Sequence, residues 1–85
     1  MYDIDWSPKA FKQLVKIKDH QAAKGILAAV DQLTAFPSCQ GVKRLENHRY
    51  GYRLRVGHYR VLFDVHKEIR IIEIQEVKKR DEHTY

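Results

Sequence analysis

The 85-residue sequence predicts a small α+β domain in which a helical hairpin packs on one face of a mostly antiparallel sheet. Three observations lead to this prediction. Apolar residues alternate at the start of the chain, then recur at helical spacing up to Phe36-Pro37, and return to strand-like alternation in the second half. The order of elements is therefore β-α-α-β-β-β. A chain of this length can bury one compact core, so we expect a single domain over residues 1–85.

The first half of the chain supplies the first strand and both helices. Residues 2–6 alternate apolar side chains with aspartates, which is typical of a short half-buried strand. Ser7-Pro8 provides an N-cap and a proline at the first helical position, and the following pattern predicts a helix over 8–18. A second helix, with an aspartate as its N-cap, is expected over 19–35 and is stopped by Phe36-Pro37.

The second half of the chain predicts strands separated by short turns. Residues 42–45 form a short strand or an extended lead-in, and longer strands are expected at 50–56, 59–66 and 69–77. Adjacent isoleucines in the last of these favour a central strand that is partly covered on both faces. Gly57-His58 suits a two-residue hairpin turn, which requires a positive φ at its first residue.

This hairpin places three arginines on one face of the sheet. A two-residue turn sets Arg55 opposite Arg60 and Arg53 opposite Leu62, and strand alternation keeps the three guanidinium groups together. Facing like charges destabilise a sheet, so the arrangement suits an anion-binding surface; a solvated cationic face is the simpler alternative. The opposite, apolar face is shared by Tyr52, Leu54, Val56, Tyr59, Val61 and Phe63.

The charge, the cysteine content and the hydropathy of the sequence indicate what kind of protein this is. The formal net charge is +5 and the pI is about 9.5, which favours attraction to polyanions. The lone Cys39 can form no internal disulfide, and the chain shows neither a signal-peptide pattern nor an apolar run of membrane-spanning length. We therefore expect a cytoplasmic protein without membrane contact. The histidines lack metal-ligand spacing, so no metal and no cofactor are expected.

Residues 52–63, YRLRVGHYRVLF, resemble the Y-R-[IL]-R-V-G-x-Y-R-[VL]-[LIV]-[FY] stretch of the RelE/ParE superfamily of bacterial type II toxins. Residues 41–45 and 78–85 resemble the flanking parts of the same family. The resemblance covers essentially the whole chain and implies the RelE-like microbial RNase fold. RelE-like members cut mRNA in the ribosomal A site, whereas ParE-like members poison DNA gyrase; the resemblance favours the RelE-like branch.

The resemblance also implies site residues. Those matching the positions of RelE-like catalytic groups are Arg53, Arg55, Arg60, Lys79 or Arg80, and Tyr85. The cations would stabilise a pentacoordinate phosphate, and a phenol beside them would have a lowered pKa and could accept a proton. RelE-like members that depend on the ribosome carry lysine where Arg53 and Arg55 stand. Four further residues are expected to contact RNA: Lys43, Arg44, His58 and His83. Each of these histidines could titrate near neutral pH, with a solvated surface position as the alternative.

The partners implied by the resemblance are the 70S ribosome with its mRNA and a cognate acidic antitoxin. Operator DNA would be contacted only through the antitoxin complex. On this hypothesis the chain is an mRNA interferase, a metal-independent endoribonuclease that inhibits translation. A gyrase poison and a non-catalytic homologue that only binds the antitoxin are the alternatives.

Other side chains near the arginines are interpreted as structural. Four aromatic residues resemble a platform for base stacking: Tyr50, Tyr52, Tyr59 and Phe63. Alternation places the last three on the core face, where packing is the simpler role. Alternation also places Asp64 on the arginine face and Glu73 and Glu76 on different faces of the last strand. These carboxylates are therefore interpreted as salt-bridge partners and not as a catalytic pair.

Overall fold

The structure is a computed structural model that describes residues 1–80, and it contains one five-stranded sheet and two α-helices. The strand order across the sheet is β1-β5-β4-β3-β2; β1 runs parallel to β5, and the other neighbours are antiparallel. The α+β class is confirmed. The sheet has one strand more than the predicted order β-α-α-β-β-β, because residues 42–44, expected as a short strand or an extended lead-in, form a strand. The elements are β1 (Asp3–Trp6), α1 (Pro8–Val15), α2 (His20–Asp31), a 3₁₀ helix η1 (Gln32–Ala35), β2 (Val42–Arg44), β3 (Tyr52–Val56), β4 (Tyr59–His66) and β5 (Ile71–Lys79).

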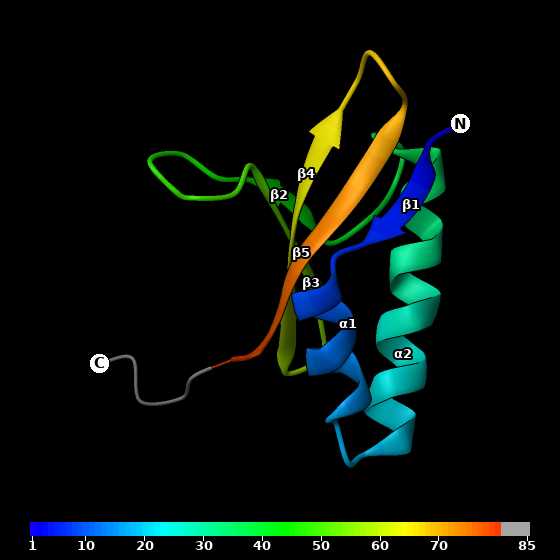
Figure 1. The fold of residues 1–85 in the computed structure, drawn as a ribbon, viewed down its shortest axis with the longest axis vertical. Coiled ribbons are helices and arrows are strands. Elements are labelled where there is room, and N and C mark those ends of the chain that lie inside the picture. Colours follow the sequence, from blue (N-terminus) through cyan, green and yellow to red (C-terminus); the bar gives the residue numbers. More distant parts are fainter. Residues whose placement is uncertain (81–85) are drawn as a thin grey trace.

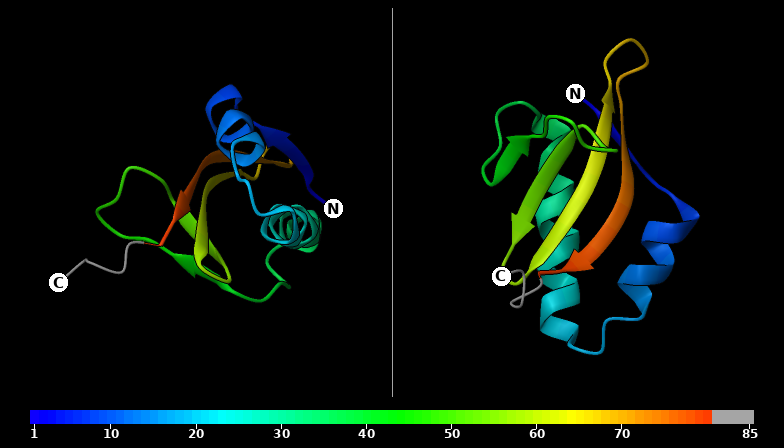
Figure 2. Two further views of the ribbon diagram at one scale, coloured as in Figure 1. Left: turned by 90° about the horizontal axis from the view of Figure 1, so that it is seen from below. Right: turned by 90° about the vertical axis from the view of Figure 1, so that its left-hand side faces the viewer.

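The helices and the sheet form two layers (Figure 1). Helix α2 crosses behind the central strands and α1 lies along β5, so the other side of the sheet is left without a covering helix (Figure 2). We call this uncovered side the open face. The loop between β2 and β3 projects away from the helices, toward the side of the open face, in both figures.

The helices begin where the sequence predicts and end earlier. Ser7 Oγ accepts the Ala10 N–H at 3.0 Å and starts α1, and the Asp19 carboxylate caps α2. Helix α1 ends at Val15 and not near residue 18, because its backbone closes with a tighter turn. Helix α2 likewise ends at Asp31, and its expected last turn is the separate 3₁₀ helix η1. Within residues 1–80, no helix is long and apolar enough to cross a bilayer.

The N-cap of α1 gives a testable contribution to stability. Replacing Ser7 with alanine removes the acceptor for the Ala10 N–H and should lower the free energy of unfolding by about 1 kcal/mol. Urea unfolding measures this loss. Ser38→Ala, at an exposed loop position, should leave the unfolding midpoint unchanged; equal midpoint shifts for both variants would contradict the capping role.

The core lies between the helices and the covered face of the sheet. Its largest fully buried side chains are Phe63, Ile26, Leu33, Ile72, Ile74, Val30 and Val61. Tyr52 stacks on Phe63 with ring centroids 5.4 Å apart, and Phe36 packs edge-on against both rings. The packing role expected for Tyr52 and Phe63 is therefore confirmed.

The predicted hairpin register is confirmed across β3 and β4. Arg55 pairs with Arg60 and Arg53 with Leu62, and Gly57 takes the positive φ of 57° that the turn requires. Strand β3 starts two residues later than expected, because residues 45–51 form a loop. Strand β5 also starts two residues late and ends at Lys79, because residues 67–70 are used in the turn before it.

A β-bulge changes which residues of β5 share a face. Leu62 pairs with Glu76 and Phe63 with Ile74, so Gln75 is an extra residue on β5. If side chains are assigned to alternate faces along β5 without allowing for Gln75, the residues before and after Gln75 cannot both be assigned to the correct face. The prediction that Glu73 and Glu76 lie on different faces is therefore wrong: the register places both on the open face.

Candidate nucleic-acid interface

The open face carries cationic side chains at the end of the sheet nearest the β3–β4 turn. Strand register places Arg55, Arg60 and Lys78 in one row across β3, β4 and β5. In the next row, Arg53 of β3 is paired with Lys43 of β2. Paired Cα atoms lie about 5 Å apart, so five positive charges occupy two neighbouring rows of the sheet.

Arg80 joins this group and Lys79 does not. Lys79 pairs with Tyr59, so its side chain is on the covered face of the sheet. Arg80, the next residue, is on the open face by alternation. The Arg80 N–H donates to the His58 carbonyl at 2.6 Å and extends the β4–β5 ladder by one residue. The charge of Arg80 also acts on Arg53. We call Arg53, Arg55, Arg60 and Arg80 the arginine cluster.

Arg53 lies at the centre of the cluster's electrostatics. Its side chain is half-buried, and its Nε is buried without a hydrogen-bond partner among residues 1–80. Burial lowers the pKa of Arg53, and the charges of Arg55, Arg60 and Arg80 lower it further. An arginine nevertheless stays protonated in a protein, so an anion placed here would receive a buried donor and relieve the repulsion.

Burial of Arg53 follows from the residue opposite it. Leu62 is on the open face, where no helix covers it, yet it is only 5% exposed. Its neighbours in the same row are Arg53 and Glu76, whose aliphatic stems are long enough to cover the leucine.

Among the described residues, no carboxylate forms an ion pair with the arginine cluster, although Glu76 lies in the same row as Arg53. Ion pairs within residues 1–80 join Lys9 to Glu76 and His66 to Glu73, and neither involves an arginine. The nearest carboxylate along β4, Asp64, is engaged differently. Its Oδ1 accepts the Gly51 N–H at 2.7 Å and its Oδ2 accepts Gln75 Nε2 at 3.2 Å. Within residues 1–80 the four arginines are thus without ion-pair partners, and such a patch is suited to phosphate.

Repulsion within the cluster gives a second testable effect on stability. Arg55 is exposed and faces Arg60, so Arg55→Gln should stabilise the free protein by about 0.5 kcal/mol in low salt. Urea unfolding at low and high ionic strength checks this, since added salt should remove the gain. Lys24→Gln on exposed α2 is the matched control. A loss of stability in Arg55→Gln at low salt would contradict the repulsion.

The structure brings only some of the other expected site residues to the cluster. Lys43 shares the open face with Arg53, but Arg44 pairs with Tyr52 and so points to the other face of β2. His58 is exposed at the tip of the hairpin, next to the cluster. Tyr85 and His83 lie outside the described residues. Lys78 was missed, because its face depends on the bulge at Gln75, and simple alternation counted through that residue gives the other face.

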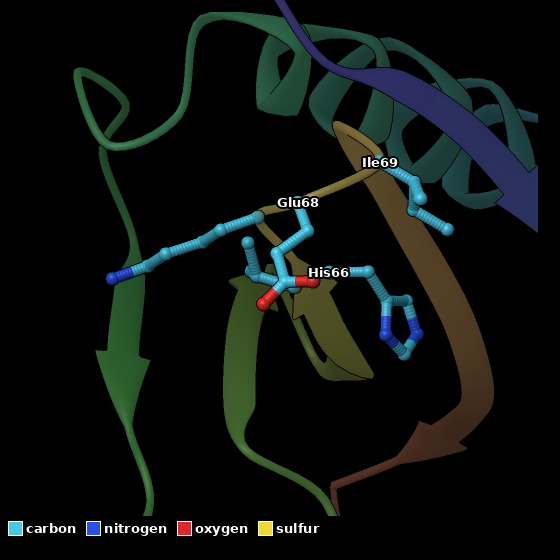
Figure 3. A pocket seen from close by; sticks show the side chains of 5 residues that line it. His66, Glu68 and Ile69 are labelled. Atoms are coloured by element: carbon cyan, nitrogen blue, oxygen red, sulfur yellow. The ribbon is translucent and has the colours of Figure 1, made fainter.

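A shallow hollow at the other end of the sheet is a separate feature. It has a volume of about 450 Å³, lies at the β4–β5 turn and is lined by Val65, His66, Lys67, Glu68 and Ile69 (Figure 3). Its residues carry mixed charges, and His66 Nε2 is 3.1 Å from Glu73 Oε1. Arg60 and this turn lie at opposite ends of β4, so the hollow is not part of the cationic site. Residues 1–80 contain no cluster of three metal-binding side chains.

Solved structures share this fold. The isolated Escherichia coli RelE toxin aligns with a TM-score of 0.80 at 16% identity, over 99% of this chain and 89% of that chain. A chain of the archaeal RelE–RelB complex from Pyrococcus horikoshii OT3 aligns with a TM-score of 0.78 at 26% identity, over 95% and 97%. A chain of the toxin–antitoxin complex RelBE2 from Mycobacterium tuberculosis aligns with a TM-score of 0.78 at 21% identity, over 93% and 98%.

The sequence itself matches one family over almost its full length. Residues 4–84 match the family described as "ParE toxin of type II toxin-antitoxin system, parDE". No curated protein matches the chain in sequence. The chain thus belongs to the ParE toxin family within the RelE/ParE superfamily, and it is the toxin of a type II toxin–antitoxin system.

Proposed function

We propose that this toxin is a ribosome-dependent endoribonuclease that cleaves mRNA in the ribosomal A site and so inhibits translation. The observation that carries the proposal is the arginine cluster, a cationic surface on the sheet in which Arg53 Nε is buried and has no hydrogen-bond partner among residues 1–80. The likeness to RelE structures adds support at the level of the fold.

The cluster supplies the electrostatic part of such a reaction. The RNA 2′-oxygen loses a proton and attacks the adjacent phosphorus, and the bond from phosphorus to the 5′-oxygen breaks as that oxygen gains a proton. Arg53 and Arg60 would bind the non-bridging oxygens, where negative charge builds up in the pentacoordinate transition state. Arg55 and Arg80 would raise the local potential and hold neighbouring phosphates.

Proton transfer needs groups other than the arginines, because arginine stays charged at any working pH. His58 is exposed at the hairpin tip beside the cluster and is a candidate from the described residues. Tyr85 and His83, outside those residues, are the other candidates. Loss of cleavage in Tyr85→Phe, with retained binding, would identify the phenol as a proton-transfer group.

The proposal includes three partners. The ribosome and its mRNA are the first two, and lysines on the helical side would bind ribosomal RNA: Lys9, Lys12, Lys16, Lys18 and Lys24. Complex formation should weaken steeply with salt, since each phosphate contact releases counterions. The third partner is a cognate acidic antitoxin that covers the arginine cluster, contacts operator DNA and folds on binding. Structures of RelE–RelB complexes support this partner. We place the protein in the cytoplasm.

Primer extension tests the proposed activity. The purified, antitoxin-free toxin is added to mRNA held in ribosomes with an empty A site and, separately, to the same mRNA alone. We expect cuts within the A-site codon that are absent without ribosomes. No cuts by protein that unfolds cooperatively would refute the proposal.

Poisoning of DNA gyrase is the second candidate, and the family description favours it, because the matched family is that of ParE toxins. A supercoiling assay with purified gyrase decides between the two activities. A gyrase poison would inhibit supercoiling, leave ribosome-bound mRNA intact and tolerate Arg60→Ala. Cleavage that is lost in Arg60→Ala would exclude this alternative and also a homologue that only binds its antitoxin.

A further inference from the structure

We propose that loop 45–51 forms a wall of the RNA site, where His48, Arg49 and Tyr50 stack on a nucleobase next to the phosphate held by the arginine cluster. This inference rests on the proposed function for the identity of the ligand, single-stranded RNA. It adds base recognition to a site whose described arginines recognise only phosphate.

The loop is closed at its base by hydrogen bonds. The Leu45 N–H donates to the Gly51 carbonyl at 2.8 Å, and the Gly51 N–H donates to Asp64 Oδ1 at 2.7 Å. Within the loop, the Tyr50 N–H donates to His48 Nδ1 at 3.0 Å. A β-carbon at position 51 would lie 3.3 Å from the Asp64 oxygen, so glycine permits this close approach. The loop is thus pre-organised, which lowers the entropy cost of binding.

Three planar side chains gather in this loop. The rings of His48 and Tyr50 lie 6.1 Å apart at 45°, and Arg49 Cζ lies 5.8 Å from the centre of the Tyr50 ring. His48 and Arg49 are exposed, and Tyr50 is half-buried. In contrast to Tyr52, which stacks on Phe63 in the core, these groups are outside the core cluster. Unpaired RNA bases stack on such aromatic rings and guanidinium planes.

The anchor of the loop lies close to the arginine cluster. Leu62 is the residue of β4 that pairs with Arg53. Asp64 lies two residues further along β4, on the same face of the sheet as Leu62 and Arg53. At about 3.3 Å per residue, the anchor is about 7 Å from the Arg53 row. The loop leaves the sheet toward the open face (Figures 1 and 2). An RNA phosphate on Arg53 would therefore have its neighbouring base beside the loop.

Asp64 is a positioning residue in this proposal and does not touch RNA. Both of its carboxylate oxygens are occupied, one by the Gly51 N–H and the other by Gln75 Nε2. Gln75 is the extra residue of the β5 bulge, so the bulge supplies the second support of the anchor. An asparagine at position 64 can still accept the Gly51 N–H, whereas an alanine cannot.

The test compares a short single-stranded RNA with an abasic oligonucleotide of the same length and charge, by fluorescence anisotropy without ribosomes. The parent toxin should bind the base-bearing RNA roughly ten-fold more tightly. The double variant His48→Ala/Tyr50→Ala should lose this preference and keep its affinity for the abasic oligonucleotide, because the arginines still bind phosphate. Tyr50→Phe, which retains an aromatic ring, should keep the preference for base-bearing RNA. His20→Ala, at an exposed position of α2, is the control and should also keep it. Equal binding of both oligonucleotides by the parent, or an unchanged preference in the double variant, would overturn the inference.

Asp64 variants test the positioning role. Asp64→Ala should lose the base preference, and Asp64→Asn should restore it, with equal affinity of both for the abasic oligonucleotide. An Asp64→Ala variant that keeps the preference would overturn the role of Asp64. The outcome is separable from that of the proposed function. If the toxin prefers base-bearing RNA but does not cleave mRNA on ribosomes, the stacking role of loop 45–51 is supported and the proposed nuclease activity is refuted. If the parent toxin cleaves mRNA but shows no base preference, the nuclease activity is supported and the stacking role is refuted.

Discussion

Arg53→Ala is expected to lower the rate of ribosome-dependent mRNA cleavage by about 10²–10³-fold, the loss typical of removing a preorganised donor to a developing negative charge. Arg53 carries a buried Nε that has no partner among the described residues, and its side chain is half-buried opposite Leu62. Neither property belongs to a freely solvated arginine. Single-turnover cleavage of mRNA on ribosomes, followed by primer extension, measures the loss.

Two controls separate this chemistry from loss of folding. Arg53→Lys keeps a positive charge and much of the stem but lacks the guanidinium fork, so its rate should fall between those of the parent and Arg53→Ala. The neighbours at the end of β5 form a matched pair: Arg80→Ala should reduce cleavage strongly, while Lys79→Ala, on the other face, should not. Equal losses in Lys79→Ala and Arg80→Ala would mean that general charge, and not the cluster, supports the activity.

The hairpin shows how much of this site the sequence can predict. Gly57-His58 fixes a two-residue turn, and a two-residue turn fixes every cross-strand pair beyond it. The register of Arg53, Arg55 and Arg60 therefore follows from local residues alone, and the structure confirms it. The same holds for the helix starts, where Ser7 and Asp19 act through their own side chains.

The rest of the site depends on contacts between segments far apart in the chain. The bulge at Gln75 arises where β5 meets β4, and it decides that Glu73 and Glu76 share the open face. It also brings Lys78 onto the arginine face, because counting through the extra residue shifts alternation. The choice between Lys79 and Arg80 depends on the same register. The one sign of the extra residue within residues 69–80 is a shift of the apolar positions, from Ile72 and Ile74 to Val77.

The cluster is held in place by the core beneath it. Arg55 and Arg60 face each other at a cost in stability, and neither forms an ion pair with a carboxylate of residues 1–80. The strands that carry them are anchored on the covered face by Leu54, Val61 and Phe63. Burial of these side chains offsets the repulsion among the four arginines on the other face. We therefore expect the core residues of β3 and β4 to contribute more to the free energy of unfolding than any other residues of these two strands.

Phe63→Ala is accordingly expected to lower the free energy of unfolding by about 3–5 kcal/mol. Phe63 is fully buried, stacks on Tyr52 at 5.4 Å and meets Phe36 edge-on at 6.4 Å, so truncation leaves a cavity bounded by two rings. Phe11→Ala is the matched control, because the same atoms are removed from a side chain that is 55% exposed.

Urea unfolding of the three proteins measures both effects. The unfolding midpoint should fall sharply for Phe63→Ala and stay near that of the parent for Phe11→Ala. Because Phe63 lies between Leu62 and Asp64 on β4, its loss should also disorder the open face. We therefore expect Phe63→Ala to bind the abasic oligonucleotide more weakly than the parent even where it is mostly folded. A large loss of stability with unchanged phosphate binding would show that the arginine cluster does not depend on this core.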